Sequence, residues 1–201
     1  MKKIKTIAER IFENNKITGV SDDFLPEFEF IKDGNCLATV KYDGSCCAII
    51  NGIFYKRYDA KQGKPLPANA IKCQPDGDEI TGHLPCWVPV DKNDPSDKWF
   101  IKALETSGFT EDGTYEAIGR HFNSNRYKLS IDTLLKHGAD IIDPSDFELS
   151  VAGIRTYFQK LFDENQAIEG IVFWQDGKPI GKIKSSDFGI KWFERCRSPK
   201  F

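Results

Sequence analysis

Residues 169–184 read EGIVFWQDGKPIGKIK, two β-rich runs that flank an Asp-Gly pair. Asp-Gly favours a two-residue hairpin turn, because both positions must adopt positive φ angles. The sequence therefore predicts an apolar strand over 168–175 and a returning strand over 178–184.

The two faces of this hairpin differ in chemistry. A two-residue loop sets Glu169 opposite Lys184, and side chains alternate between faces along each strand. One face then carries a carboxylate, two ammonium groups and an aromatic ring: Glu169, Lys182, Lys184 and Phe173. The other face carries core-forming side chains: Val172, Trp174 and Ile183. Burying the charged face without a function is costly, so we expect it to surround a polyphosphate with a metal ion. An ordinary cross-strand ion pair between Glu169 and Lys184 is the alternative.

The composition of the 201 residues is that of a folded domain. Hydrophobic residues make up 40% of the chain, which is enough for a sizeable core, and 29% charged residues of mixed sign argue against disorder. No apolar run approaches the ~20 residues of a membrane-spanning helix. The length predicts a single domain over 1–201, because no linker-like segment marks a boundary.

The net charge of −2 hides an asymmetry along the chain. Residues 178–201 carry a net charge of +5, which leaves −7 on the remainder. A basic region on an acidic body is typical of a protein that holds phosphates at one site, and a solvated basic tail is the alternative.

The cysteines and the first residues indicate in which cellular compartment the protein is expected. Residues 1–3 resemble the basic start of a signal peptide, but polar residues interrupt the apolar centre that should follow. The six cysteines are therefore expected to be reduced thiols. A zinc site is disfavoured because its candidate ligands are too loosely spaced: Cys73, His83 and Cys86. We expect a soluble, cytoplasmic chain with no membrane partner.

Hydrophobic spacing predicts the remaining elements. Apolar residues at helical spacing or in helix-like runs predict helices over 4–15, 130–138 and 146–164. Alternating or β-rich runs predict strands within 36–58, near 87–90 and over 113–120, with long loops through 60–98. Asn51-Gly52 predicts a second hairpin, in which Ile50 faces Ile53.

Five short elements that could carry chemistry follow one another in order. They are Lys41-Tyr-Asp-Gly44, Arg57 in Tyr55-Lys-Arg-Tyr58, Glu116 in Tyr115-Glu-Ala117, Glu169-Gly-Ile-Val172 and Lys182-Ile-Lys184. A Lys-x-Asp-Gly match alone is weak, since chance produces it in a few per cent of chains of this length. The ordered set is far more specific than any single member.

This ordered set resembles the covalent nucleotidyltransferases, the superfamily of polynucleotide ligases and mRNA capping enzymes. The resemblance covers about 36–190, and finer features in 38–47 and 82–90 resemble the small RNA ligase group that includes the vertebrate 5′–3′ RNA ligase. It implies an α+β, ATP-grasp-like ligase domain, in which antiparallel sheets form a nucleotide cleft flanked by helices.

The resemblance implies Lys41, Lys182 and Lys184 as the catalytic residues, with ATP as the nucleotide. Lys41 forms a phosphoramidate with AMP, and it must attack as a neutral amine although free lysine titrates near pH ~10.4. Neighbouring cations, a bound metal and partial desolvation all lower a lysine pKa. The two other lysines also balance charge that grows on the α-phosphate in the transition state.

The remaining motif residues are assigned to metal, sugar and base. Glu169 is expected to bind Mg²⁺ or Mn²⁺, directly or through water. By resemblance, Glu116 binds the ribose or orders the water shell of the metal. Arg57 contacts the ribose or the 5′-phosphate of the acceptor strand, and Phe173 is the candidate that stacks on the base.

Some of these positions have structural alternatives. The structural alternative for Arg57 is an ion pair with Asp43 or Asp59. Asp43 and Gly44 are expected to shape the turn that orients Lys41. Residues 120–121, Arg-His, either hold a phosphate or end a strand.

The resulting hypothesis is an ATP-dependent RNA ligase that works in RNA repair on ends carrying a 5′-phosphate and a 3′-hydroxyl. Lysyl-AMP forms, AMP passes to the 5′-phosphate, and the 3′-hydroxyl displaces AMP. The alternatives are a DNA nick ligase, an adenylyltransferase with a protein or small-molecule acceptor, and a nucleotide-binding module that does not turn over. The sequence indicates no obligate protein partner.

Two departures from the family pattern modify this hypothesis. Thr39 stands where many DNA ligases have a glutamate that reads the base. Residues 185–201 are too few for a C-terminal OB-fold domain, so capping activity is disfavoured and the basic end is expected to supply phosphate contacts.

Overall fold

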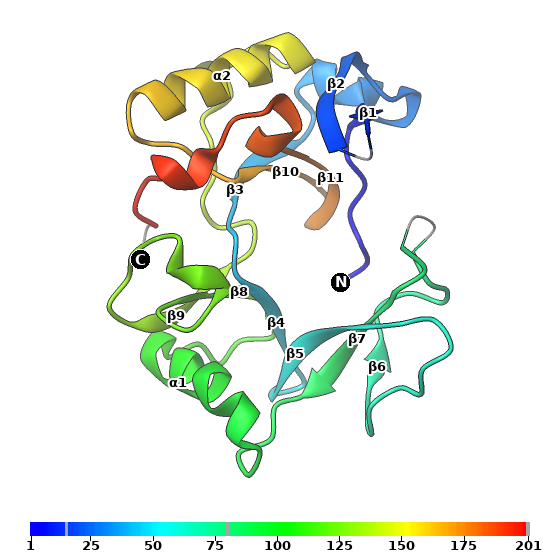
Figure 1. Cartoon of the computed structure of the whole chain (residues 1–201), viewed down its shortest axis with the longest axis vertical. Coiled ribbons are helices and arrows are strands. Elements are labelled where there is room, and N and C mark those ends of the chain that lie inside the picture. Colours follow the sequence, from blue (N-terminus) through cyan, green and yellow to red (C-terminus); the bar gives the residue numbers. More distant parts are fainter. Residues whose placement is uncertain (15, 79–80, 200–201) are drawn as a thin grey trace. The chain divides into compact units, whose positions relative to one another are not determined.

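A computed structural model of the chain describes residues 1–14, 16–78 and 81–199. Contacts divide the chain into two compact units: unit 1 is Met1–Lys3 with Asp43–His137, and unit 2 is Ile4–Tyr42 with Gly138–Phe201. The strand pairs of the described sheets are antiparallel and the α-helices are few (Figure 1). The predicted α+β class is therefore confirmed at this level.

Unit 2 contains two small sheets and one long helix. A three-stranded sheet has the order β11-β10-β3, from β3 (Leu37–Lys41), β10 (Gly170–Gln175) and β11 (Lys178–Lys184). A two-stranded sheet pairs β1 (Ala8–Glu13) with β2 (Lys16–Phe24), and the helix is α2 (Val151–Asp163). The helix predicted over 146–164 is thus confirmed, with Ser150 as its N-cap.

The helix predicted over 4–15 is wrong, because β1 occupies this segment. Ile7 is buried, whereas Ile11 and Phe12 of the same expected helical face are exposed. The Ile7 N–H donates to the Lys182 carbonyl at 2.9 Å, so the segment extends beside the hairpin. Tertiary pairing therefore overrides a helix-like spacing of apolar residues.

The hairpin of β10 and β11 forms with the predicted turn but with a different register. Asp176 and Gly177 both have positive φ, as the turn requires. Gln175 pairs with Lys178 as expected, but the register shifts by one residue between Phe173 and Trp174. The next pairs along the strands are consequently one position away from the predicted ones: Phe173 with Gly181, Val172 with Lys182, and Gly170 with Lys184.

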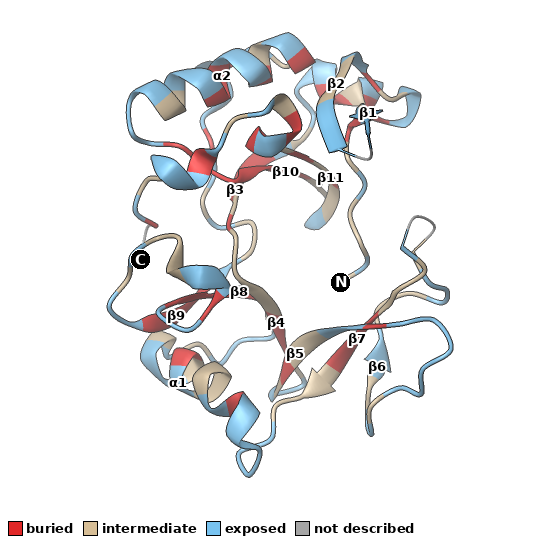
Figure 2. Ribbon diagram, viewed as in Figure 1, coloured by how far each residue is buried: buried red, intermediate tan, exposed pale blue. Residues whose placement is uncertain are grey.

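The hydrophobic core of unit 2 lies on one face of the three-stranded sheet. Phe173 is fully buried there between its cross-strand neighbours Ala38 and Gly181. A Cβ at Gly181 would overlap Ile7 and press on Phe28, so these two side chains cover the same face. Figure 2 shows buried residues along β10 and on one side of α2.

Unit 1 is built on a six-stranded sheet with the order β6-β7-β5-β4-β8-β9. Its strands are β4 (Ser45–Ile50), β5 (Ile53–Ala60), β6 (Ile71–Lys72), β7 (Leu84–Pro89), β8 (Gly113–Gly119) and β9 (Asp132–Lys136). The predicted hairpin at Asn51-Gly52 is confirmed, since Ile50 pairs with Ile53. The strands predicted near 87–90 and over 113–120 are confirmed as β7 and β8.

Two further predictions fail in unit 1. The helix predicted over 130–138 is strand β9, whose residues pair with β8 and are mostly buried. Helix α1 (Lys98–Ser107) was not predicted, although Gly108 ends it in the left-handed conformation that favours glycine. Its Trp99, Phe100 and Leu104 pack on a core of sheet residues that includes Cys47 and Tyr115.

Short 3-10 helices complete the described chain: Pro26–Asp33, Pro95–Asp97, Asn123–Asn125, Pro144–Asp146, Ser185–Phe188 and Trp192–Glu194. Among the described residues, no helix is both long and apolar enough to cross a lipid bilayer.

Candidate functional site

The candidate site lies on the face of the unit 2 sheet that is opposite the core. Lys41, the last residue of β3, pairs with Gly170 of β10, which in turn pairs with Lys184 of β11. These three residues form one row across the sheet, and the next row is Thr39, Val172 and Lys182. Three lysines from two strands therefore project from one face, separated in the first row by a glycine without a side chain.

Glu169 joins the lysines of the first row. Its Oε2 accepts from the Lys41 amine at 2.7 Å, and its Oε1 lies 2.8 Å from the Lys184 amine. The Glu169 side chain is only 5% exposed, against 22% for Lys41 and 30% for Lys184. The predicted contact between Glu169 and Lys184 is present, although Glu169 precedes β10 and its backbone carbonyl accepts from the Ser185 N–H and not from Lys184.

Lys182 is a third cation beside the two ion pairs that Glu169 makes with Lys41 and Lys184. Burial, together with repulsion from Lys41, Lys184 and Arg10, lowers the pKa of Lys182 to about 8, against a smaller opposing effect of Glu169. Three ammonium groups share one nearby carboxylate, so the row is electropositive. A low lysine pKa from burial and like charges is typical of functional sites, and structural ion-pair networks also produce it.

Asp187 fixes the end of β11 that carries Lys184. It is almost fully buried, and its Oδ2 accepts from the Lys184 backbone N–H at 2.9 Å. Its Oδ1 accepts from the Arg10 guanidinium, also at 2.9 Å. Arg10 in β1 is therefore a further cation near the site, and its own charge is compensated by Asp187.

Phe173 does not lie on the face where the sequence placed it. The one-residue shift in register puts its side chain in the core, opposite Lys182 and Lys184. The apolar side chain that does stand among the lysines is Val172, which the sequence assigned to the core face. The prediction that Phe173 shares the charged face is wrong.

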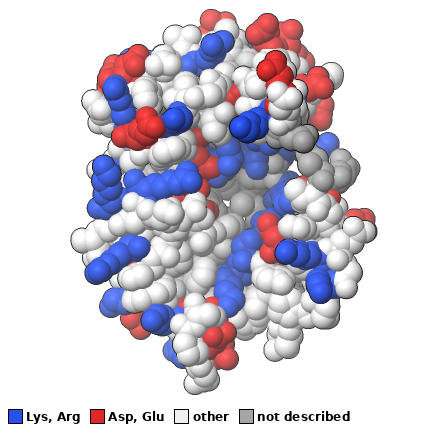
Figure 3. Space-filling model, viewed as in Figure 1, with Lys and Arg blue, Asp and Glu red and all other residues white. Residues whose placement is uncertain are grey.

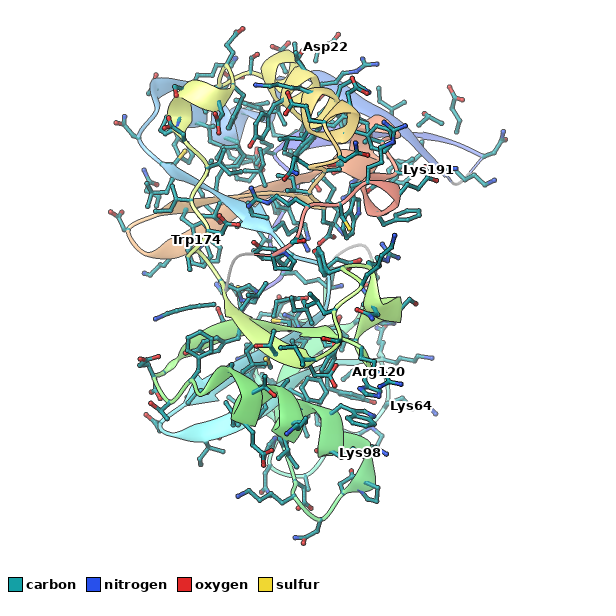
Figure 4. The ribbon with its side chains drawn as sticks, turned by 90° about the vertical axis from the view of Figure 1, so that its left-hand side faces the viewer. Asp22, Lys64, Lys98, Arg120, Trp174 and Lys191 are labelled. Carbon is teal, nitrogen blue, oxygen red and sulfur yellow. The ribbon has the colours of Figure 1, made fainter. Side chains whose placement is uncertain are left out.

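Beside Val172, the sheet face carries a tryptophan anchored to a threonine. The Trp174 indole N–H donates to Thr39 Oγ1 at 2.9 Å, and this hydroxyl lies 3.3 Å from the Val172 carbonyl oxygen. Trp174 is labelled in Figure 4. A Cβ at Gly138 would lie 3.3 Å from the indole, so the backbone there borders the ring. The sequence did not single out Trp174, because the expected register placed it in the core.

A second polar network follows the nucleophile candidate in the chain. The Tyr42 hydroxyl donates to Asp140 Oδ2 at 2.5 Å, and the Arg197 guanidinium contacts the same oxygen. Burial, together with Asp140, raises the pKa of Tyr42 to about 12. This network joins three separate segments of unit 2, and its members are too far apart in sequence for a local pattern to reveal them.

The basic end is not a free tail over the residues that the structure describes. Arg197 pairs with Asp140, Arg195 lies over the Phe162 ring, and Lys182 and Lys184 of β11 belong to the site. Acidic and basic side chains are interspersed on the visible surface of unit 2 (Figure 3). The predicted contribution of Lys200 lies outside the described residues.

Two other predicted site residues, Glu116 and Arg57, belong to unit 1. Glu116 is buried in β8, where its Oε1 accepts from the Gly44 N–H at 2.9 Å and its Oε2 lies 2.9 Å from His137 Nε2. Arg57 pairs with Asp59 at 2.8 Å, as in its structural alternative, and also donates to the Met1 carbonyl.

The turn after the nucleophile candidate is tightly packed within unit 1. A Cβ at Gly44 would overlap the Ala117 carbonyl oxygen, so only glycine fits there. The Asp43 N–H donates to the Tyr127 hydroxyl at 2.8 Å, and the Asp43 carboxylate lies 2.9 Å from Arg126. These contacts support the predicted role of Asp43 and Gly44 in shaping the turn.

His121 has structural partners on both sides. Its Nδ1 lies 2.6 Å from the Asp132 carboxylate, and its ring stacks on Trp99 with 3.3 Å between the ring centroids. The neighbouring Arg120 is exposed and points outward (Figure 4). The geometry therefore favours the end of a strand over a phosphate site for His121.

Comparisons with known proteins do not add a family to this description. No protein-family model matches the chain, and curated proteins yield no significant match.

Proposed function

We propose that this chain is an ATP-dependent RNA ligase that forms lysyl-AMP on Lys41 and joins 5′-phosphate to 3′-hydroxyl RNA ends. The observation that carries the proposal is the Lys41 amine, held at 2.7 Å by Glu169 in one row with Lys184 and beside Lys182. These residues come from three of the motifs on which the resemblance rests.

The charge of this row suits a polyphosphate. Three ammonium groups against one carboxylate leave an excess positive charge, and an anion would offset the mutual repulsion of the lysines. Partial burial strengthens this attraction, because the local dielectric constant is lower than in water. A sheet that needed only an ion pair for stability would require one lysine here, not three.

The row also provides the groups that nucleotidyl transfer needs. Lys41 must be neutral to attack, and Glu169 Oε2 is the acceptor towards which its proton points. The amine forms a bond to the α-phosphorus, the bond from that phosphorus to the bridging oxygen breaks, and the electron pair leaves with pyrophosphate. Lys182 and Lys184 stabilise the negative charge that develops on the phosphate oxygens.

The two later steps use the same phosphorus chemistry. An oxygen of the RNA 5′-phosphate attacks the lysyl-bound phosphorus, and Lys41 leaves and regains a proton. The RNA 3′-hydroxyl then attacks the activated 5′-phosphorus and AMP leaves, which yields a phosphodiester. Glu116 and Arg57 keep their proposed roles toward ribose and phosphate on the resemblance alone.

A divalent ion fits Glu169 only together with phosphate groups. Both Glu169 oxygens already face ammonium groups, so a bare cation would be repelled. Mg²⁺ is commonly held by one or two carboxylates plus the phosphates of its substrate. When bound in this way, the ion would add charge stabilisation at the transferred phosphate.

The base is proposed to lie against Val172, not Phe173. Val172 stands in the second row beside Lys182, with Thr39 and Trp174 as its polar and aromatic neighbours. An apolar contact of this kind suits the face of a purine.

The test is covalent labelling by ATP that carries its label on the α-phosphate, with Mg²⁺, in parallel with GTP and NAD. We expect a label from ATP on the unaltered protein, none on Lys41→Ala or Lys41→Arg, and full labelling of Lys178→Ala, an exposed lysine of the same hairpin. RNA with a 5′-phosphate should discharge the label, and a nicked DNA duplex should not.

The other outcomes contradict the proposal in distinct ways. A label that persists in Lys41→Ala shows a different nucleophile. A label that nicked DNA discharges equally well identifies a DNA ligase, and one that neither nucleic acid discharges indicates another acceptor. Folded protein that takes no label from any donor is a binding module.

A further inference from the structure

Three metal-ligating side chains meet on the sheet of unit 1. Cys46 in β4 is the direct cross-strand partner of Glu116 in β8, and His137 directly follows β9, the next strand (Figure 1). The His137 N–H donates to the Thr114 carbonyl at 3.0 Å, so the backbone at this position is also tied to β8. All three side chains are therefore held by one hydrogen-bonded sheet.

The donor atoms are close enough to share an ion. One ligand atom from each of Cys46, Glu116 and His137 lies within 4.8 Å of both others. A tetrahedral zinc ion with ordinary bond lengths places its donors about 3.3–3.6 Å apart. Binding would therefore draw the three side chains closer together.

The imidazole of His137 presents its Nε2 atom to the cluster. Nε2 lies 2.9 Å from Glu116 Oε2, so it is the ring nitrogen that can share an ion with the carboxylate. Nδ1, on the other side of the ring, is buried and has no hydrogen-bond partner among the described residues. It is the atom that would make the second hydrogen bond typical of a metal-bound histidine.

We propose that Cys46, Glu116 and His137 form a binding site for a divalent transition metal, with Zn²⁺ as the ion that suits them best. A thiolate, an imidazole and a carboxylate are a borderline-soft ligand set, which favours zinc over Mg²⁺ or Ca²⁺. Three protein ligands leave the fourth position to water or to an added ligand, as in open zinc sites.

Binding requires that Cys46 lose its proton to solvent. The thiol is mostly neutral without a metal, because burial and Glu116 raise its pKa while Arg57 and the N-terminal amine act in the opposite direction. Cys73 acts in the same direction as Glu116, and Cys47 is a further titratable neighbour. Since a metal displaces this proton, apparent affinity should increase about tenfold per pH unit around neutrality.

This site goes beyond the proposed ligase activity. It shares Glu116 with the role toward ribose that the resemblance gives to that residue, so an ion bound here would compete with that role. It lies wholly within unit 1, and its test contains no nucleotide. The sequence pointed away from a zinc site at Cys73, His83 and Cys86, and the ligands found here come from three other positions.

The first experiment is a titration of the reduced, metal-free protein with Co²⁺, which reports its ligands by absorption. A cysteine thiolate bound to Co²⁺ gives a strong near-ultraviolet charge-transfer band, and tetrahedral Co²⁺ gives intense visible bands. We expect both for the unaltered protein, with displacement by one equivalent of Zn²⁺. Absence of the charge-transfer band from the folded, unaltered protein would overturn the proposal without any variant.

Variants then assign the ligands. Cys46→Ser should abolish the charge-transfer band, and His137→Gln should weaken Zn²⁺ binding at least tenfold. The matched controls are Cys73→Ser, another partly buried thiol of unit 1, and His121→Gln, another histidine paired with a carboxylate. If either control loses the signal, or Cys46→Ser keeps it, the site is elsewhere.

Discussion

The Lys41 amine lies 2.7 Å from the Glu169 carboxylate although 128 positions separate the two residues in the chain. The same carboxylate holds Lys184, so one buried side chain compensates two cations on opposite sides of a glycine. Because a third lysine stands beside them, the removal of any one member changes the charge balance of the others.

Glu169→Gln is expected to lower the free energy of unfolding by about 1–3 kcal/mol, because the lysines lose the carboxylate that offsets their repulsion. Adding Lys184→Met should return part of this loss, which a double-mutant cycle by urea denaturation would measure. The control is Glu194→Gln, since Glu194 is exposed and only 3.7 Å from Lys191, and its change should stay within ~0.5 kcal/mol. Strictly additive effects of the first pair would contradict the coupling.

Mg²⁺ alone should not bind at Glu169, because ammonium groups already occupy both carboxylate oxygens. An ATP analogue with a methylene bridge between the α- and β-phosphates should bind more tightly with Mg²⁺ than without it. Calorimetry on the unaltered protein and on Glu169→Gln would show whether this gain needs the carboxylate. Saturable Mg²⁺ binding without nucleotide that Glu169→Gln removes would refute the prediction.

Lys182→Met is expected to stabilise the protein while abolishing labelling by ATP. Lys182 has a pKa of about 8 when folded and its ordinary value of 10.5 when unfolded. Between these values the unfolded chain binds more protons, so the stability of the unaltered protein increases with pH. The gain in the free energy of unfolding of the variant should therefore be largest below pH ~8, at about 1–3 kcal/mol, and should disappear above pH ~10.5.

Denaturation of Lys182→Met at several pH values would measure this gain, with Lys178→Met as the exposed control. An advantage that does not change with pH would be inconsistent with the shifted pKa.

Gly170→Ala should destabilise unit 2 by about 2–4 kcal/mol, because the added Cβ would overlap the Ile183 carbonyl oxygen. Gly19→Ala is the matched control: Gly19 lies in β2, and its added Cβ would have only Ile11 near it, at 4.0 Å. Its effect should be close to zero or slightly stabilising. Thermal denaturation of both variants distinguishes the two, and equal effects would argue against the close approach of β10 and β11.

Turn chemistry could be read from the sequence more reliably than register. Asp176-Gly177 and Asn51-Gly52 both form the expected turns, because few residues tolerate positive φ. The register shift in the first hairpin follows Pro179, which has no N–H to donate to Trp174. No local sequence pattern indicates at which residue the register of a strand shifts, so Phe173 was assigned to the wrong face of the sheet.

Segments whose conformation depends on distant partners were predicted least well. Residues 4–15 and 130–138 have helix-like apolar spacing, but pairing with other strands makes them β1 and β9. This second error concealed His137, which follows β9 and meets Glu116. Helix α1 was missed although signals were present: Asp94-Pro95 starts the 3-10 turn that leads into it, and Gly108 stands at its end.

The one-residue shift in the β10–β11 hairpin also bears on how the chain folds. A hairpin closed in the regular register would put Phe173 on the same face as Lys182 and Lys184. Either the aromatic ring would then leave the core, or two ammonium groups would enter the space that Ile7 and Phe28 line. Such a hairpin is penalised in both orientations, so it should reopen before the rest of unit 2 assembles on it. The charge of Lys182 and Lys184 would in this way also select the observed alignment of the two strands.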